Sequence, residues 1–153
     1  MALGRPIEIE LAVVSSANPK SVTDVASAFV RAINHQNIEE LAGLMTEDHV
    51  FIDSLGTCVE GREKMTAGWA GYFRMIPDYT IVIEEAFAVG AVVLMCGTAQ
   101  GTYAPDSALS AENRWSTPAA LRAVVRGELV AEWRVYADNE PIRQIAARNR
   151  REA

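Results

Sequence analysis

Asp53 is the residue whose type and neighbours are best suited to chemistry. It falls near the end of an expected strand at residues 48–55, on the face that also carries His49 and Phe51. A carboxylate on an apolar face resists ionisation because its charged form loses hydration, which makes it a better general base near neutral pH. Alternatively, where the strand gives way to Ser54-Leu55-Gly56, the same side chain could accept hydrogen bonds from backbone N–H groups. The sequence leaves both roles open.

No second group completes a known catalytic set with Asp53. His49 is four residues away, about 13 Å along an extended strand, so a direct His-Asp pair is not expected. Cys58 and Cys96 lie far apart without metal-ligand spacing, so reduced thiols are expected rather than a disulfide. The sequence has no Ser-His-Asp, Cys-His or metal-binding pattern, and we predict no metal ion and no other cofactor.

Polar residues in the later strands are expected to face solvent. Thr98 and Gln100 share one face of a long strand, and Ala99 lies on the other. Turned inward, Thr98 and Gln100 could bind a carbonyl or hydroxyl group, but residues of these types more often lie outside. Arg122 and Arg134 are likewise expected on the outer face of a sheet rather than against a ligand.

Capping residues and apolar spacing predict three helices around the strand that contains Asp53. Ser21 suits the N-cap of a first helix and Asp24 its first turn, while Asn37 suits the cap of a short second helix. A third helix is predicted over residues 61–75, ended by Pro77. Further strands are predicted at residues 79–88, 91–103, 115–125 and 129–137, with an extra N-terminal strand at 6–14 and a polar helical tail at 142–153.

This order of elements predicts a single α+β domain over residues 1–153, with its core at about 21–141. Helices followed by a meander do not alternate as βαβ units do, which argues against a doubly wound parallel sheet. We expect a curved antiparallel sheet of four or five strands, wrapped by the N-terminal helices. A strongly bent sheet cannot meet its helices everywhere, so a cavity remains between them. Gly97 and Gly101 are candidate positions for the bends.

Composition excludes several classes of protein. Half of the 153 residues are hydrophobic, which is enough for a core without disulfides or metals. The net charge of −6 argues against nucleic-acid binding, and the arginines near the end, Arg143 to Arg151, fit a solvated helix end. We find no signal peptide and no apolar run long enough for a bilayer. A cytoplasmic protein without membrane or nucleic-acid partners is expected.

Several segments resemble the nuclear transport factor 2-like superfamily. They are Ala32-Ile33-Asn34, the run from Asp48 to Asp53, Gly61-Arg62-Glu63 and the ending from Glu132 to Pro141. With Trp69 and Tyr72-Phe73, the ending is most similar to the SnoaL-like polyketide cyclase branch. The resemblance covers roughly residues 21–141.

The resemblance implies a cone-shaped α+β barrel, usually dimeric, whose pocket holds a small apolar ligand. Known members include ketosteroid isomerases, limonene epoxide hydrolases, polyketide cyclases and proteins without catalytic activity, so the fold does not settle the function. Asp53 matches the base of the isomerases. Because members of the superfamily are usually dimeric, we expect a homodimer formed through the outer sheet face. The residues expected to line the pocket are Phe29, Phe51, Trp69, Phe73, Ala99, Ala120, Trp133 and Val135.

The chain departs from each catalytic pattern of the family. The hydrogen-bond donors of the isomerases fall at Phe29 and Ala120, neither of which can donate, and the cyclase histidine falls at Ala99. The epoxide hydrolase set falls near Ala99, Gly97 and Val135. Two hypotheses remain open. The chain is an acid–base isomerase or cyclase that acts on a small apolar carbonyl compound with Asp53 as base, or it is a non-catalytic ligand-binding or association module.

Overall fold

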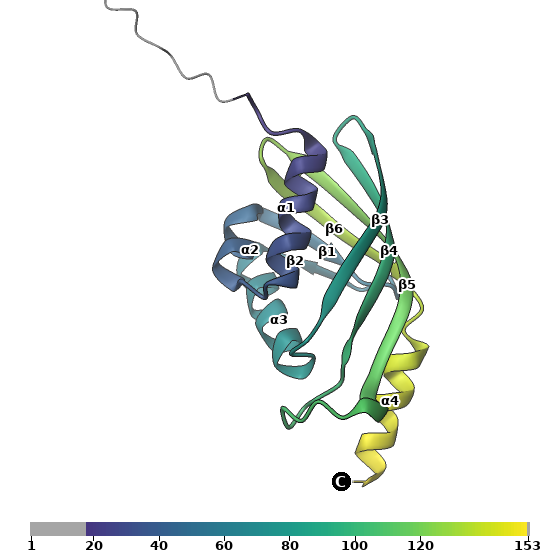
Figure 1. Cartoon of the computed structure of the whole chain (residues 1–153). Helices are drawn as coiled ribbons and strands as arrows, with labels where there is room; N and C mark the ends of the chain where they lie inside the picture. Colours follow the sequence, from purple (N-terminus) through teal and green to yellow (C-terminus); the bar gives the residue numbers. More distant parts are fainter. Residues whose placement is uncertain (1–17, 153) are drawn as a thin grey trace, which may run out of the picture.

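A bent six-stranded sheet and three helices on its concave face form the body of the molecule (Figure 1). The computed structural model describes residues 18–152, so the strand expected at 6–14 lies outside the described residues. In sheet order the strands are β2 (Cys58–Glu60), β1 (Met45–Ile52), β6 (Leu129–Ala137), β5 (Arg114–Arg126), β4 (Val92–Thr102) and β3 (Thr80–Val89). The predicted α+β fold with a curved sheet is confirmed.

Two of the three covering helices begin at side-chain caps that the sequence predicts. Ser21 caps α1 (Val22–Asn34) in a reciprocal capping box with Asp24, because each side chain bonds the backbone N–H of the other residue. Asn37 caps α2 (Ile38–Leu44) through a bond from the Glu40 N–H. The third helix, α3 (Arg62–Met75), follows β2 and ends before Pro77, whose ring cannot continue a helix.

The sheet differs from the expected one in two respects. It is mixed, because β1 pairs in parallel with β6 while every other pair is antiparallel. The three-residue strand β2, too short for a visible alternation, pairs with β1 and was not predicted. In addition, β1 runs from Met45 to Ile52 rather than over 48–55. Asp53 therefore lies just after the strand, at the start of a turn.

Two glycines of β4 allow the backbone to approach its neighbours, and the first of them lies beside an irregularity of the sheet. A Cβ on Gly97 would lie 1.9 Å from the carbonyl oxygen of Val82, and the register with β3 shifts next to this point, between Ile83 and Glu85. A Cβ on Gly101 would lie 2.4 Å from Cγ2 of Ile76. Gly101 thus lets the connection between α3 and β3 pack directly onto β4.

The two faces of the sheet differ in chemistry as the alternation predicts. Ala99 faces inward and is buried, whereas Gln100 is exposed and Thr98 half-buried on the other face. Arg122 forms an ion pair with Glu132 on that outer face. The guanidinium of Arg134 lies 4.9 Å from the centre of the Tyr136 ring. These polar side chains therefore stay away from the concave face, as expected.

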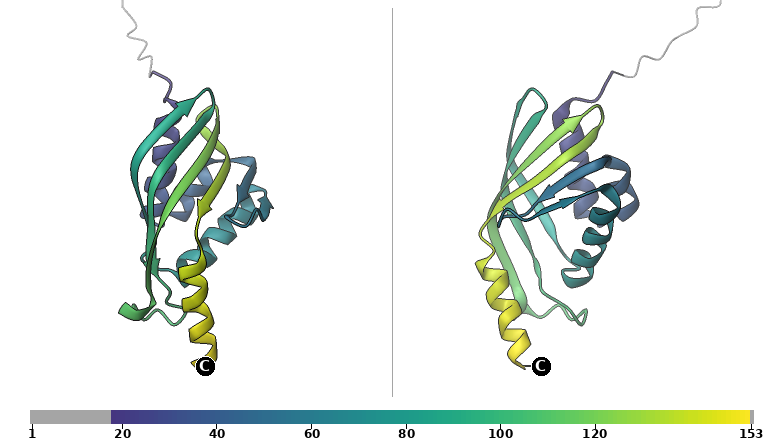
Figure 2. Two further views of the ribbon diagram at one scale, coloured as in Figure 1. Left: turned by 90° about the vertical axis from the view of Figure 1, so that its right-hand side faces the viewer. Right: turned by 180° about the vertical axis from the view of Figure 1, so that it is seen from behind.

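The tail forms a longer helix than expected and is partly anchored. Helix α4 (Glu140–Glu152) continues from β6 beside β5 (Figure 2), and its Ile145 belongs to the buried core. Arg148 does not extend freely into solvent, because its guanidinium donates to the carbonyl oxygen of Glu112 and to Asn113 Oδ1. Within residues 18–152, no helix is long and apolar enough to cross a membrane.

Candidate functional site

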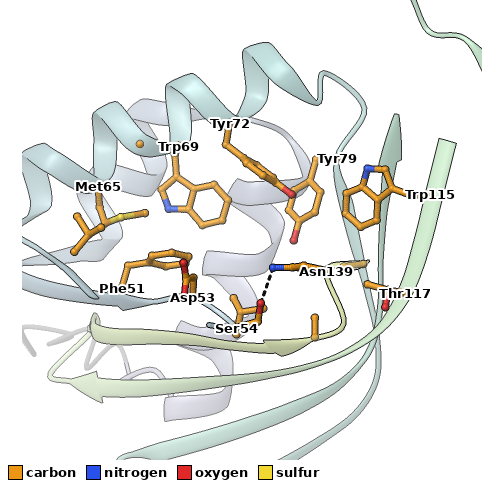
Figure 3. Close-up of a pocket in the computed structure, with 15 residues that line it drawn as sticks. Phe51, Asp53, Ser54, Met65, Trp69, Tyr72, Tyr79, Trp115, Thr117 and Asn139 are labelled. Carbon is orange, nitrogen blue, oxygen red and sulfur yellow. Dashed lines mark hydrogen bonds between the residues drawn. The ribbon is translucent and has the colours of Figure 1, made fainter. Parts of the chain in front are cut away.

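A cavity of about 360 Å³ lies between α3 and the concave face of the sheet (Figure 3). That volume is within the range of small-molecule sites. Residues from every strand except β3, from α3 and from three connections line it: Phe51, Asp53, Ser54, Val59, Met65, Gly68, Trp69, Tyr72, Tyr79, Ala99, Trp115, Thr117, Val135, Ala137 and Asn139. The lining is mostly apolar, with a few hydroxyl and amide groups and one carboxylate.

Aromatic rings in mutual contact form one wall of the cavity. Phe51 and Trp69 meet edge to face at a centroid distance of 6.2 Å, and Trp69 and Tyr72 meet at the same distance. Tyr72 and Tyr79 are 5.0 Å apart, and Trp115 lies 6.0 Å beyond Tyr79. Such contacts restrain each ring, so the wall is preorganised for a flat or compact apolar ligand.

Asp53 lines the cavity and also organises the turn after β1. Its Oδ1 atom accepts hydrogen bonds from the backbone N–H groups of Leu55 at 2.9 Å and Thr57 at 2.8 Å. Its own backbone N–H donates to the carbonyl oxygen of Thr57, and Gly56, at φ 84°, completes the turn. The backbone-bonded arrangement and the position at the pocket, which were alternatives at the sequence level, therefore occur together.

The structure brings five of the expected site residues around one cavity. Asp53 and Phe51 come from the end of β1, and Trp69 comes from the inward side of α3. Ala99 on β4 and Val135 on β6 contribute from the concave face of the sheet. Ala99, where the cyclases place a histidine, leaves that part of the lining apolar.

The other four expected residues lie outside the cavity. Phe29 and Trp133 are fully buried and 4.8 Å apart, because α1 packs directly on the sheet there and leaves no space. Phe73 is stacked against Trp69, 5.4 Å away, and does not reach the lining. Ala120 is on the outer face, since residues 115, 117, 119 and 121 of β5 are the buried ones.

Ten lining residues were not among those expected: Ser54, Val59, Met65, Gly68, Tyr72, Tyr79, Trp115, Thr117, Ala137 and Asn139. Tyr72 is three residues after Trp69 on α3, a spacing that puts both on one helix face. Trp115 and Thr117 share the inward parity of β5 with Leu121. These spacings could have indicated the three residues, whereas Tyr79 lies in a connection that has no periodic signal.

His49 belongs to the core and not to the cavity. It is fully buried, lies 5.9 Å from the ring of Phe29, and donates from Nδ1 to the carbonyl oxygen of Val130 at 2.7 Å. Burial lowers the pKa of this histidine below 6.5, while that hydrogen bond and the charges of Asp48 and Glu132 act in the opposite direction. A pair between His49 and Asp53 is therefore absent, as expected from their spacing.

The electrostatics of the cavity are simple. Asp53 is the one carboxylate among the lining residues. No lysine, arginine or histidine lines the cavity, so Asp53 has no cation beside it there. Burial raises the pKa of Tyr72 and of Tyr79 above the ordinary value of 10.0, so both phenols stay protonated at neutral pH. Such a site suits a largely apolar molecule with a polar group near one end.

Comparison with known proteins agrees with this architecture. The family model of the SnoaL-like domain matches residues 26–144. No curated protein matches the sequence.

Solved structures with the same fold come from several bacteria. A Catenulispora acidiphila protein with a ketosteroid isomerase-like fold, in complex with trimethylamine, is 20% identical with a TM-score of 0.70; the match covers 83% of this chain and 95% of that one. A Shewanella denitrificans protein assigned as a SnoaL-like polyketide cyclase is 15% identical with a TM-score of 0.71, covering 83% and 97%. An M. tuberculosis LEH-like epoxide hydrolase is 16% identical with a TM-score of 0.68, covering 83% and 90%. At these identities the likeness shows the fold alone.

Proposed function

The chain belongs to the SnoaL-like domain family, and from that premise we propose that it is an acid–base isomerase or cyclase for a small, largely apolar carbonyl compound. Asp53 acts as the general base on the compound bound in the cavity. The observation that carries the proposal is the position of this carboxylate, the one among the residues that line an otherwise mostly apolar space.

The turn after β1 supports this role for Asp53 by holding the carboxylate in a fixed orientation. Oδ1 is occupied by the N–H groups of Leu55 and Thr57, whereas Oδ2 has no hydrogen-bond partner within residues 18–152. Oδ2 is thus available to a ligand, and the base needs no rearrangement before it reacts. Positioning of this kind is a substantial part of general-base catalysis.

The chemistry follows from that one base. Asp53 removes a proton from the carbon next to the carbonyl group, and the electron pair of the C–H bond forms the enolate. Returning the proton to another carbon isomerises the compound. Alternatively, the enolate carbon attacks a second carbonyl group and closes a ring in an aldol-type step, and the alkoxide that forms takes the proton back from Asp53. Neither route needs a cofactor.

A second candidate function is ligand binding without catalysis. It is favoured by the same hydrogen bonds, because an aspartate that caps a turn has a structural reason to be there. The trimethylamine complex of the Catenulispora acidiphila protein shows a relative of the same fold holding a small molecule. In this case the ligand leaves the cavity chemically unchanged.

Exchange of the α-protons of 1-tetralone and other small cyclic ketones in D₂O distinguishes the two candidates. We expect the protein to accelerate exchange, measured by proton NMR, and Asp53→Asn to abolish the acceleration. Asn is a matched replacement because its Oδ1 can still accept from Leu55 and Thr57. Exchange that is equal in both proteins would refute the base, and no acceleration with any ketone would favour binding alone.

We also propose a homodimer formed through the outer face of the sheet. Phe87 on β3 and Leu94 on β4 are directly paired and exposed, and Val82 and Tyr136 are exposed on the same side. Exposed apolar side chains on a sheet face favour association with a second copy. Light scattering that shows a monomer at high concentration would contradict this proposal.

A further inference from the structure

We propose that the hydroxyl groups of Tyr79 and Tyr72 are the hydrogen-bond donors that bind the carbonyl oxygen of the ligand. The identity of the ligand as a carbonyl compound rests on the proposed function above, but the donor role itself requires no catalysis. Neither residue occupies a position where the family resemblance places a donor. Those positions are Phe29, which is buried against Trp133, and Ala120, which is on the outer face.

Both tyrosines enter the cavity from the side of the helices, while Asp53 enters from the end of β1. Figure 3 shows the Tyr79 hydroxyl directed into the cavity toward Asn139, with Tyr72 beside it. The two rings are 5.0 Å apart and nearly perpendicular, at 87°. A ligand bound between them and Asp53 would have its carbonyl oxygen near the phenols and its α-carbon near the carboxylate.

The connection that carries Tyr79 is fixed at several points. The carboxylate of Asp78 accepts from the backbone N–H of Thr102 at 2.6 Å and from its hydroxyl at 2.7 Å. Gln36 Nε2 donates to the carbonyl oxygen of Pro77 at 2.6 Å. The lack of a side chain at Gly101 lets this segment lie against β4. A donor held in this way loses little conformational entropy when it binds a ligand.

The tyrosines are chemically suited to a site that contains Asp53. They remain neutral, because burial raises the pKa of each phenol above its ordinary value. No cation is among the lining residues, so negative charge that develops on the ligand oxygen has to be stabilised by neutral donors. Neither phenol has a hydrogen-bond partner in the part of the chain that the structure describes, which leaves both free to donate to a ligand.

The test compares two probes that differ only in the carbonyl group, 1-tetralone and tetralin. Their dissociation constants are measured for the wild type, for Tyr79→Phe, for Tyr72→Phe and for the double variant. Tyr136→Phe, at an exposed tyrosine of the outer face, is the control. We expect the double variant to bind 1-tetralone about five- to twentyfold more weakly, as the loss of one or two neutral hydrogen bonds predicts, and tetralin within about twofold of the wild type.

The infrared band of the bound carbonyl group gives a second measurement that a merely structural role would not change. Hydrogen bonding lowers the C=O stretching frequency, so the band should move to higher frequency in each cavity variant and stay in place in Tyr136→Phe. Equal weakening of both probes, an unchanged band, or failure of 1-tetralone to bind would overturn the proposal. Unchanged tetralin binding shows that each variant has an intact cavity.

The same experiment separates this inference from the proposed function. If the band responds to the tyrosines but no ketone exchanges its α-protons, the donors stand and the catalytic role of Asp53 fails. If exchange depends on Asp53 but the band ignores both tyrosines, the base stands and the donors fail.

Discussion

The Oδ1 atom of Asp53 lies 2.8 Å from the backbone nitrogen of Thr57. This contact, together with the one to Leu55, joins the side chain at the cavity to the turn that ends β1. The residue proposed to act on the ligand therefore also has a structural role. Variants of Asp53 have to be chosen so that the two roles are measured separately.

The structural role predicts different stabilities for two substitutions of Asp53. Asp53→Ala should lower the free energy of unfolding by about 1–2 kcal/mol, because two backbone N–H groups lose their acceptor. Asp53→Asn should stay within about 0.5 kcal/mol of the wild type, since an amide oxygen can replace Oδ1. Urea denaturation measures both values. Equal losses in the two variants would show that the carboxylate charge, rather than the acceptor, holds the turn.

Glycines of β4 should not tolerate a side chain. Gly101→Ala should cost about 1–3 kcal/mol, because its Cβ would overlap a methyl group of Ile76 that can shift only slightly. Gly97→Ala should cost more, since its Cβ would meet the backbone oxygen of Val82. Gly43→Ala in α2, with no atom within 4 Å, is the control and should be neutral or stabilising. Thermal unfolding that ranked the three variants otherwise would contradict the packing described for β4.

Filling the cavity from the sheet should abolish ligand binding. Ala99→Leu places extra carbon atoms in the lining, whereas Ala120→Leu adds the same atoms on the outer face of the sheet. We expect the first variant to lose most of its affinity for tetralin in a fluorescence titration and the second to keep it. The opposite outcome would mean that the binding site lies on the outer face.

His49 should make stability depend on pH below neutrality. Its pKa in the folded protein is below 6.5, so from about pH 6.5 downward the unfolded chain takes up a proton that the folded protein does not. The folded state loses up to about 1.4 kcal/mol per pH unit in this window. The advantage of the wild type over His49→Asn, which removes this titration, should shrink between pH 7 and pH 5.

The control for this pH effect is the other histidine. His35 follows α1 and is exposed, so His35→Asn removes an imidazole without removing a buried one. A constant difference between wild type and His49→Asn across the pH range would contradict the assigned cause.

The helices and the alternation of strand faces could be predicted from the sequence because their causes are local. Ser21, Asp24 and Asn37 cap their helices as their side chains predict. β6 runs from Leu129 to Ala137, the expected range, because a tight turn precedes it and polar residues follow it. These features depend on neighbours a few residues away.

The parts that could not be predicted depend on pairings between distant segments. Alternation separates Ala119 from Ala120, but only the register with β4 and β6 decides which faces inward, and a shift of one residue reverses the answer. The parallel pairing of β1 with β6 is equally non-local. Phe29 and Trp133 face inward as expected, yet the distance between helix and sheet makes their surroundings a packed core rather than a cavity.

A crystal structure of the 1-tetralone complex tests the central claim most directly. The account predicts the ketone inside the aromatic cavity, with its oxygen within about 3.2 Å of the Tyr79 hydroxyl and its α-carbon on the side of Asp53 Oδ2. A ketone bound elsewhere, or bound in the cavity with its carbonyl group directed away from the tyrosines and its α-carbon away from Asp53, would contradict it.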